Sequence, residues 1–161
     1  MKRPKRLKQG DRIGVAAPAG PIDPKVLKKG IRVLESMGLC PVLAEHVFKK
    51  DRYLAGTDTQ RAEDLNGLFG DPEIKGIFCA RGGYGVNRVL PRLDSSTIRK
   101  NPKVFVGSSD ITLLLLFLIQ QCSLVTFHGP MVAGNFGRYS MPKSKRQFNE
   151  ILFGNKSGKR L

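Results

Sequence analysis

The chain has 161 residues, of which 40% are hydrophobic and 25% are charged, so it can bury an ordinary core in one globular domain. Its three cysteines, Cys40, Cys79 and Cys122, lie far apart, which excludes a closely spaced metal site and a disulfide framework and favours a reducing, cytoplasmic location. The apolar run 111–119 is too short to span a bilayer and no export signal is evident, so we expect a soluble protein.

The net charge of +15 is concentrated at the two ends of the chain. Residues 2–12 hold six Lys or Arg and residues 138–160 hold seven, whereas the stretch between them is much closer to balance. A nucleic-acid interface more often combines basic and aromatic residues along one face. Terminal charge is typical of solvated surface, so nucleic-acid binding is the least favoured alternative.

Hydrophobic patterns and turn residues predict alternating strands and helices. A buried strand from residue 12 leads into a Pro/Gly turn at 18–20, and Asp23 is expected to cap a helix that ends at Gly38. The later elements are a strand at 41–44, a helix at 59–69, a strand at 74–80, a short helix at 86–93, a strand at 104–107, a helix at 111–121, a strand at 124–127 and a last element at 148–154. This order predicts an α/β fold, in which a mostly parallel sheet carries helices on both faces.

Binding sites in such sheets lie beyond the carboxyl ends of the strands. Four unusual stretches fall there, namely 17–21 after the first strand, 81–85 after the third, 107–110 after the fourth and 128–131 after the fifth. The predicted topology therefore gathers these stretches at one edge of the sheet.

The stretch Arg81-Gly-Gly-Tyr-Gly directly follows the third predicted strand. It does not fit a dinucleotide-binding loop, because Arg88 stands in place of the third glycine and no acidic ribose ligand follows, so no cofactor is predicted. A glycine pair here can present backbone N–H groups to an oxyanion. From the residues alone, an ordinary tight turn is the favoured interpretation.

The stretch Gly107-Ser-Ser-Asp joins a predicted strand to a predicted helix, which is the setting of a nucleophile elbow. The usual elbow has a second glycine two residues after the serine, where this chain has Ile111. The pattern alone therefore favours a helix cap by Ser108 or Ser109, with Asp110 in the first turn.

His128 and His46 are the only histidines, and a serine nucleophile generally needs a base. His128 lies at the same edge beside Gly129 and Pro130, where a structural hydrogen bond is the favoured role and a catalytic base the alternative. His46 is expected to be exposed in a polar loop. Cys79 is expected to be a buried, inert thiol within a strand.

Four stretches together resemble the LD-carboxypeptidases, a family of serine peptidases that includes the microcin C immunity peptidase. They are residues 10–21, 71–85, 101–112 and 126–131, in family order across almost the whole chain. The resemblance implies a flavodoxin-like or Rossmann-like α/β fold of the class I glutamine amidotransferase-like N-terminal type. It also implies a hydrolase that removes the terminal D-alanine from murein tetrapeptide in peptidoglycan recycling, with no metal or cofactor.

The family's nucleophile is the serine directly before the aspartate of its Gly-aromatic-Ser-Asp motif, which maps to Ser109. The resemblance then implies that the oxyanion donors are the backbone N–H groups of Asp110 and of the Gly82-Gly83 turn, most simply Gly83. Residues expected to line the edge of the substrate site are Arg81, Gly82, Tyr84 and His128.

Two departures from the family pattern bear on function. Ser108 occupies the place of the expected aromatic residue, which puts packing around the elbow and substrate fit in doubt. The family's enzymes also have a second domain that supplies the histidine base and a glutamate, whereas this chain ends at Leu161. Residues 1–161 are therefore interpreted as an amino-terminal nucleophile domain, inactive without its carboxy-terminal partner domain, and a homodimer is a candidate assembly because family members are often dimers.

Two further functions stay open at this point. One is an immunity-type serine peptidase that cleaves acylated nucleotide antibiotics, which shares the same chemistry. The other is a non-catalytic module that binds muropeptides without cutting them.

Overall fold

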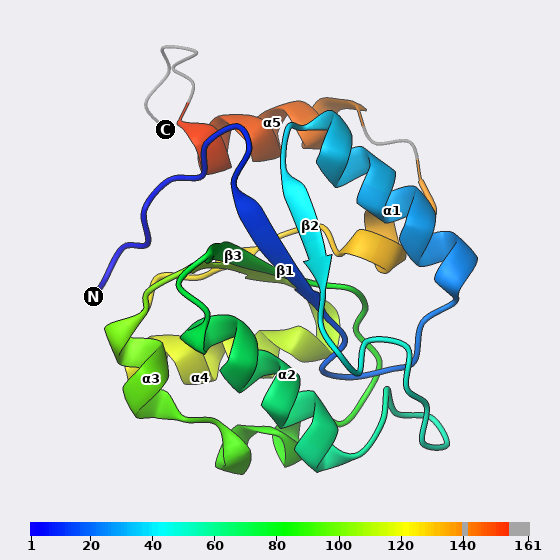
Figure 1. Ribbon diagram of the computed structural model, residues 1–161, viewed down its shortest axis with the longest axis vertical. Helices are drawn as coiled ribbons and strands as arrows, with labels where there is room; N and C mark the ends of the chain where they lie inside the picture. Colours follow the sequence, from blue (N-terminus) through cyan, green and yellow to red (C-terminus); the bar gives the residue numbers. More distant parts are fainter. Residues whose placement is uncertain (140–141, 155–161) are drawn as a thin grey trace.

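A five-stranded parallel sheet forms the centre of the computed structural model, which describes residues 1–139 and 142–154 (Figure 1). Its strands are β1 (Arg12–Ala16), β2 (Cys40–Leu43), β3 (Ile74–Cys79), β4 (Val104–Gly107) and β5 (Phe127–His128). They lie in the order β2-β1-β3-β4-β5, with every neighbouring pair parallel. This is the flavodoxin-like order, so the predicted α/β fold is confirmed. The strand order reverses between β1 and β3, which marks the expected place for a ligand.

Helices cover both faces of the sheet (Figure 1). One face carries α1 (Pro24–Ser36) and α5 (Pro142–Phe153). The opposite face carries α2 (Asp58–Gly70), α3 (Ser95–Lys100) and α4 (Thr112–Cys122). The three-layer arrangement leaves the loops at the carboxyl ends of the strands free to form a site.

Short helical turns occupy several of the connections. They are η1 (Val86–Arg88), η2 (Leu90–Arg92), η3 (Ser109–Ile111) and the π-helix η4 (Val132–Phe136). The single helix predicted at 86–93 is in fact the two 3₁₀ turns η1 and η2. The sequence patterns did not predict α3 or η4, and the last strand is shorter than expected because only Phe127 and His128 pair with β4.

Two helix starts show how local chemistry defines the elements. The Asp23 carboxylate accepts a hydrogen bond from the Lys25 N–H at 2.8 Å, as predicted for a cap of α1. At α2, Thr57 Oγ1 accepts from the Gln60 N–H at 3.2 Å and Gln60 Oε1 accepts from the Thr57 N–H at 3.0 Å. This reciprocal capping box starts α2 earlier than the apolar pattern indicated.

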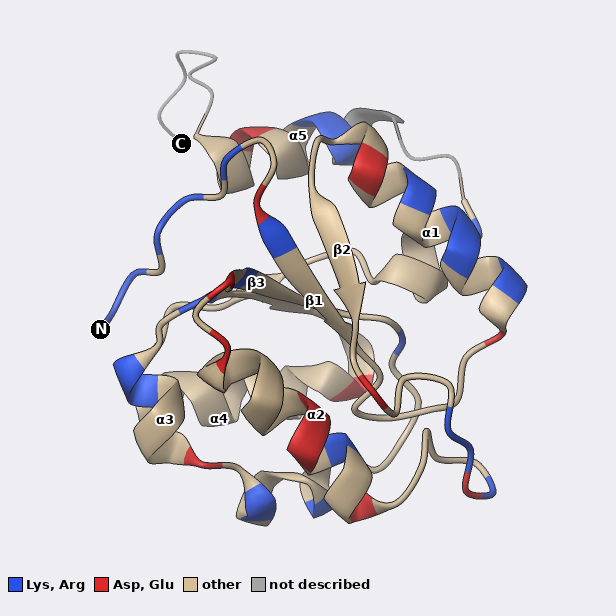
Figure 2. Ribbon diagram, in the orientation of Figure 1, with Lys and Arg blue, Asp and Glu red and all other residues tan. Residues whose placement is uncertain are grey.

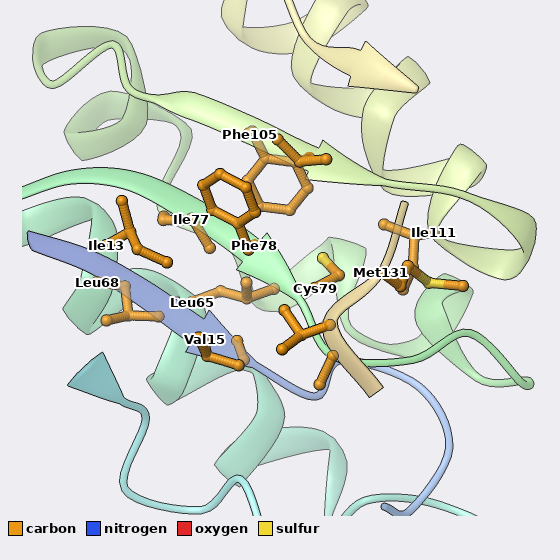
Figure 3. Close-up of a cluster of buried hydrophobic side chains, with 14 of the residues drawn as sticks. Ile13, Val15, Leu65, Leu68, Ile77, Phe78, Cys79, Phe105, Ile111 and Met131 are labelled. Atoms are coloured by element: carbon orange, nitrogen blue, oxygen red, sulfur yellow. The ribbon is translucent and has the colours of Figure 1, made fainter. Parts of the chain in front are cut away.

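The core lies between the sheet and its helices, and it is built from strand residues that are buried on both faces (Figure 3). Ile13, Phe78 and Phe105 are fully buried. On the α2 face, Phe69 stacks on Phe105 and the helix packs closely on β1, since a Cβ at Gly14 would lie only 2.5 Å from Leu68 Cδ2. Only glycine in β1 permits this approach, which sets the position of α2 relative to the carboxyl end of β1.

Cys79 lies at the end of β3 inside this core (Figure 3). It is fully buried, and burial raises the pKa of its thiol well above the ordinary value. The thiolate is therefore strongly disfavoured, and the prediction of an inert thiol is confirmed.

Lys and Arg residues are frequent along the amino-terminal segment and on α1 (Figure 2). Lys2, Arg3, Lys5, Arg6 and Lys8 are all exposed along the amino-terminal segment. Of the basic residues expected at the other end, those at 156, 159 and 160 lie outside the described residues. Within residues 1–139 and 142–154, no helix combines the length and apolar character needed to cross a membrane.

Candidate active site

A cavity of about 430 Å³ opens at the carboxyl edge of the sheet, next to the β1/β3 switch point. The connections after β1, β3, β4 and β5 all contribute to its wall. Its lining residues are Ile22, Asp23, Val26, Arg81, Gly82, Gly83, Ser109, Met131, Ala133, Gly134, Arg138 and Tyr139. The cavity therefore brings Ser109 together with the glycine pair, as the predicted topology required.

Ser109 stands in an unusual backbone conformation between β4 and α4. Its φ of +59° lies in the left-handed region, whereas Ser108 before it is fully extended at φ −157°. A non-glycine residue in the left-handed region costs about 1–2 kcal/mol, so the surrounding structure must hold it there. A nucleophile elbow requires such a strained residue on a strand-to-helix turn, so the conformation of Ser109 is compatible with that hypothesis, and Ser109 is exposed to the cavity.

The alternative role of these serines as helix caps is wrong. Neither the turn at Ser108 nor the start of α4 at Ile111 has a side-chain cap hydrogen bond. The Asp110 carboxylate turns instead to the loop after β3, where its Oδ2 accepts from the Val86 N–H at 3.0 Å. Local pattern favoured capping, but the tertiary contact with the neighbouring loop determines where Asp110 points.

The structure explains why Ile111 can occupy the position at which the usual nucleophile-elbow motif has glycine. Ile111 is fully buried, and a Cβ at Gly107 would lie 2.4 Å from its Cγ2. Ile111 therefore fits because Gly107, the last residue of β4, has no side chain. Gly107, the first glycine of the motif, therefore leaves the space that the Ile111 side chain occupies.

The backbone of Gly82 lies directly against Ser109. A Cβ at Gly82 would lie 2.9 Å from Ser109 Cβ, 3.0 Å from its Oγ and 3.6 Å from the Asp110 nitrogen. Any other residue at position 82 would push against the serine. The glycine thus allows the loop after β3 to approach the Ser109 hydroxyl.

The Gly82–Gly83 peptide is held in one orientation by the loop after β1. The Gly20 N–H donates to the Gly82 carbonyl oxygen at 3.0 Å. Because the C=O and N–H of a trans peptide point in opposite directions, the Gly83 N–H points away from Gly20. Gly83 itself has φ +129°, and a Cβ there would lie 3.0 Å from the Gly20 nitrogen, so this turn requires glycine.

The other residues expected at the site edge divide into two groups. Arg81 lines the cavity, and its Nη1 donates to the Pro21 carbonyl at 2.8 Å. Tyr84 lies outside the cavity lining, 54% exposed, with its ring centroid 6.0 Å from that of Tyr53. The structure therefore brings Arg81 to Ser109's cavity and leaves Tyr84 on the adjoining surface.

His128 ends β5 and pairs in register with Gly107 at the end of β4. Its side chain is exposed and is not among the cavity-lining residues. In the described part of the chain, no residue hydrogen-bonds to its ring, in contrast to the structural bond that the sequence favoured.

His46 was predicted to be exposed, but its side chain is mostly buried. Its side chain is only 16% accessible, and its Nδ1 lies 2.8 Å from Asp64 Oδ1, which also accepts from the His46 backbone N–H. Burial raises the pKa of Asp64, and the His46 contacts partly offset that effect. A polar local sequence indicated a loop, but α2 supplies the carboxylate that draws the ring inward.

Arg138 and Tyr139 are cavity residues that the sequence patterns did not indicate. The preceding η4 is held at the end of β3, because the Ala133 and Gly134 N–H groups both donate to the Ala80 carbonyl, at 2.8 and 3.1 Å. A single π-helical turn has no hydrophobic period to recognise, so no local signal could have placed this segment. Within residues 1–139 and 142–154, no group of three or more His, Cys, Asp or Glu could hold a metal ion.

Comparison with known proteins gives the family directly. The sequence profile of the LD-carboxypeptidase N-terminal domain matches residues 13–129. A probable murein peptide carboxypeptidase of Bacillus subtilis strain 168 is 43% identical over 151 residues, which cover 93% of this chain and 47% of that protein. The murein tetrapeptide carboxypeptidase of Pseudomonas aeruginosa is 38% identical over 138 residues, covering 84% of this chain and 45% of that protein.

Solved structures agree with this relationship. The crystal structure of an MccF-like protein from Bacillus anthracis strain Ames matches with a TM-score of 0.90 at 31% identity, over 94% of this chain and 47% of that one. The chain thus spans about half the length of the relatives that it matches. On the combined profile, sequence and structural similarity, the chain belongs to the LD-carboxypeptidase family.

Proposed function

We propose that this chain is the nucleophile-bearing domain of a serine-type LD-carboxypeptidase that removes the terminal D-alanine from murein tetrapeptide in the cytoplasm. The observation that carries the proposal is the left-handed backbone of Ser109 beneath the Gly82 backbone, in a cavity at the switch point. Family membership and relatives named as murein peptide carboxypeptidases support the substrate class.

In the proposed reaction, Ser109 Oγ attacks the carbonyl carbon of the amide bond before D-alanine. The C–N bond then breaks, D-alanine leaves with a proton on its amine, and an ester to Ser109 remains. Water hydrolyses that ester and restores the hydroxyl. Each half of the reaction passes through a tetrahedral intermediate with a negatively charged oxygen, which the site must stabilise.

Two backbone N–H groups are proposed as the oxyanion donors. The Gly83 N–H belongs to the peptide whose carbonyl is held by Gly20, and that peptide adjoins Ser109. The Asp110 N–H directly follows the nucleophile. Asp110 lies just before α4, an eleven-residue helix whose amino end adds a favourable positive potential for a developing oxyanion.

The charge of the cavity suits a substrate with a free carboxyl terminus. Arg81 and Arg138 line the cavity with Ser109, together with one carboxylate, that of Asp23, which accepts from the Lys25 N–H at the start of α1. Arg81 is partly engaged by the Pro21 carbonyl, whereas in the described residues no carboxylate pairs with Arg138. We infer that Arg138 binds the terminal carboxylate of D-alanine, because a guanidinium offers two parallel donors to that group.

The general base is proposed to come from outside this chain. No histidine lines the cavity within the described residues, and the chain spans about half the length of its relatives. Without a base an alcohol is a weak nucleophile, and removal of a triad can cost about a million-fold in turnover. We therefore expect the 161-residue chain alone to be essentially inactive.

The test compares three proteins for D-alanine release from purified murein tetrapeptide. The full-length protein that carries this chain should release D-alanine, its Ser109→Ala variant should not, and the 161-residue chain should show no release. Absence of release by the full-length protein would contradict the proposed substrate. Release by the chain alone that disappears in Ser109→Ala would contradict an external base and assign that role to His128.

An immunity-type peptidase is the second candidate. It is supported by the TM-score of 0.90 to the MccF-like protein, because MccF is named as the microcin C7 self-immunity protein. The two candidates differ in the leaving group of the cleaved amide bond, which is a free amino acid in one and a nucleotide-linked group in the other. Cleavage of an aminoacyl sulfamoyl adenosine with no action on the tetrapeptide would select the second candidate.

A further inference from the structure

Arg61 is a buried arginine that does not touch Ser109 but joins the loops around it. It lies in α2 and is only 1% exposed. One nitrogen, Nη1, donates to the Pro18 carbonyl at 2.7 Å and to the Gly85 carbonyl at 2.9 Å. A single guanidinium nitrogen therefore links the loop after β1 to the loop after β3.

These two loops are the ones that form the glycine turn beside Ser109. The loop after β1 supplies the Gly20 N–H that orients the Gly82–Gly83 peptide. Arg61 holds that same loop at Pro18, two residues earlier, and holds the glycine-rich loop at Gly85, two residues later than Gly83. Arg61 thus adds a second link between the two loops, beside the direct hydrogen bond from Gly20 to Gly82.

The peptide between Gly85 and Val86 is held from both ends. Its carbonyl oxygen accepts from Arg61, and its N–H donates to Asp110 Oδ2 at 3.0 Å. Asp110 is the residue directly after Ser109. Because a peptide unit is rigid and planar, these two contacts connect Arg61 through the loop to the residue beside the nucleophile.

The charge of Arg61 is balanced within the same cluster. Its Nη2 donates to Asp58 Oδ1 at 2.5 Å, and Arg88 Nε donates to Asp58 Oδ2 at 3.0 Å. Burial lowers the pKa of Arg61, and the Asp58 charge counteracts that effect. Taking a guanidinium out of water is costly, and the contacts of Nη1 with the two loop carbonyls and of Nη2 with Asp58 offset that cost, whereas Nε is buried without a partner in the described residues.

We propose that Arg61 is a positioning residue that holds the Gly82–Gly83 peptide in its orientation over Ser109, through the Pro18 and Gly85 carbonyls. This inference rests on the proposed function, in which the Gly83 N–H binds the oxyanion. Replacement of Arg61 should then weaken the stabilisation of the transition state and leave the affinity for the substrate unchanged. Lysine at position 61 keeps the charge but cannot reach two loop carbonyls and Asp58 together, since it lacks the planar fork.

The kinetic test uses Arg61→Lys and Arg88→Met in the full-length protein that carries this chain. Loss of a positioned oxyanion donor lowers kcat by about 100- to 1,000-fold, so Arg61→Lys should lower kcat by that amount with KM changed by less than about twofold. Arg88→Met is the matched control, because the Arg88 side chain contacts the same Asp58 carboxylate but no carbonyl of the two loops, and its backbone N–H, which donates to the Gly85 carbonyl at 3.2 Å, is kept in the variant. Its kcat should stay within about twofold of the wild type. Equal losses in both variants, or a loss confined to KM, would overturn the proposal.

A second readout uses the 161-residue chain and needs no activity. In ¹H–¹⁵N NMR spectra, Arg61→Lys should shift the Gly83 and Val86 amide signals and speed hydrogen exchange of the Val86 N–H, which is bonded to Asp110, whereas Arg88→Met should leave both signals unchanged. Unchanged Gly83 and Val86 amides in a folded Arg61→Lys chain would overturn the positioning role. If Arg61→Lys does not fold, Asp110→Asn provides the same measurement from the other end of the Gly85–Val86 peptide. Failure of the wild-type protein to release D-alanine would contradict the proposed function alone, since the NMR result decides the positioning role separately.

Discussion

The backbone of Gly82 is in contact with the Ser109 side chain, with room for a hydrogen and not for a Cβ. The missing Cβ would lie 3.0 Å from Ser109 Oγ, tighter than ordinary van der Waals contact. Gly82 lies in the loop after β3 and Ser109 in the turn after β4, and the carboxyl ends of these two strands lie side by side in the parallel sheet. This contact relates the glycine pair to the serine and underlies the first prediction.

Gly82→Ala should reduce turnover without unfolding the protein. The added methyl group must displace Ser109 or the glycine loop by a few tenths of an ångström or more, and misplacement near 1 Å can cost about 100-fold in rate. The measurement is kcat for D-alanine release by the full-length protein, together with the melting temperature. Gly67→Ala on α2 is the control, because a Cβ there has nothing within 4 Å. Wild-type turnover in Gly82→Ala would show that the contact does not position the reacting groups.

At position 109, glycine should give a more stable protein than alanine, which is the reverse of the usual order in helices. At φ +59° alanine retains the strain of the left-handed conformation, about 1–2 kcal/mol, whereas glycine does not. We expect Ser109→Gly to be more stable than Ser109→Ala by about 1 kcal/mol, as measured by urea unfolding of the 161-residue chain. In the same region, exposed Gln120 within α4 should show the ordinary order, with Gln120→Ala more stable than Gln120→Gly by about 1 kcal/mol. The same order at both sites would mean that Ser109 is not strained.

Arg138→Ala should weaken recognition of a free carboxyl terminus. A hydrogen bond between charged groups contributes about 1.5–3 kcal/mol, so KM for the tetrapeptide should rise about 10- to 100-fold with little change in kcat. Arg32→Ala, which removes an exposed charge from α1, should leave KM unchanged. Binding of the tetrapeptide amide should be insensitive to either change. A KM equal to the wild-type value in Arg138→Ala would refute the assigned role.

Because Lys103 is buried, the free energy of unfolding should rise with pH through the alkaline range. Its side chain is 5% exposed and its Nζ donates to the Asp71 carbonyl, and burial lowers the pKa of Lys103 to about 8. Since the unfolded lysine keeps its ordinary pKa of 10.5, the unfolded state binds more protons than the folded state between about pH 8 and 10.5. The free energy of unfolding should therefore rise with pH across that window, by about 1–3 kcal/mol.

The measurement for Lys103 is urea unfolding of the wild-type chain and of Lys103→Met at about pH 7, 8, 9 and 10, which spans most of the predicted window. Other groups that titrate in this range are common to both proteins, so the difference between the two curves isolates Lys103. Parallel curves would show that Lys103 titrates at its ordinary pKa in the folded protein.

Local patterns predicted most of the elements because their signals are short-range. The Asp23 cap and the β-like runs before residues 81 and 108 depend on neighbours within a few positions, and each was found where expected. The helix predicted at 86–93 is two separate 3₁₀ turns, and the π-helix η4 was not predicted, since a single turn produces no hydrophobic period. His46 was misplaced because its partner, Asp64, lies 18 residues away along the chain.

The sequence by itself determined the parallel α/β architecture and the family resemblance, because both are carried by periodicity and by motifs that stand in order along the chain. Only the tertiary structure decided that Ser109 is strained and does not cap α4, since it lies against the Gly82 backbone, which comes from the loop after a neighbouring strand. The same holds for Arg61, whose surrounding helix shows nothing unusual in its pattern. The proposed role arises because α2 packs against β1 at Gly14. This packing brings the Arg61 guanidinium within reach of two loops that are far apart in the sequence.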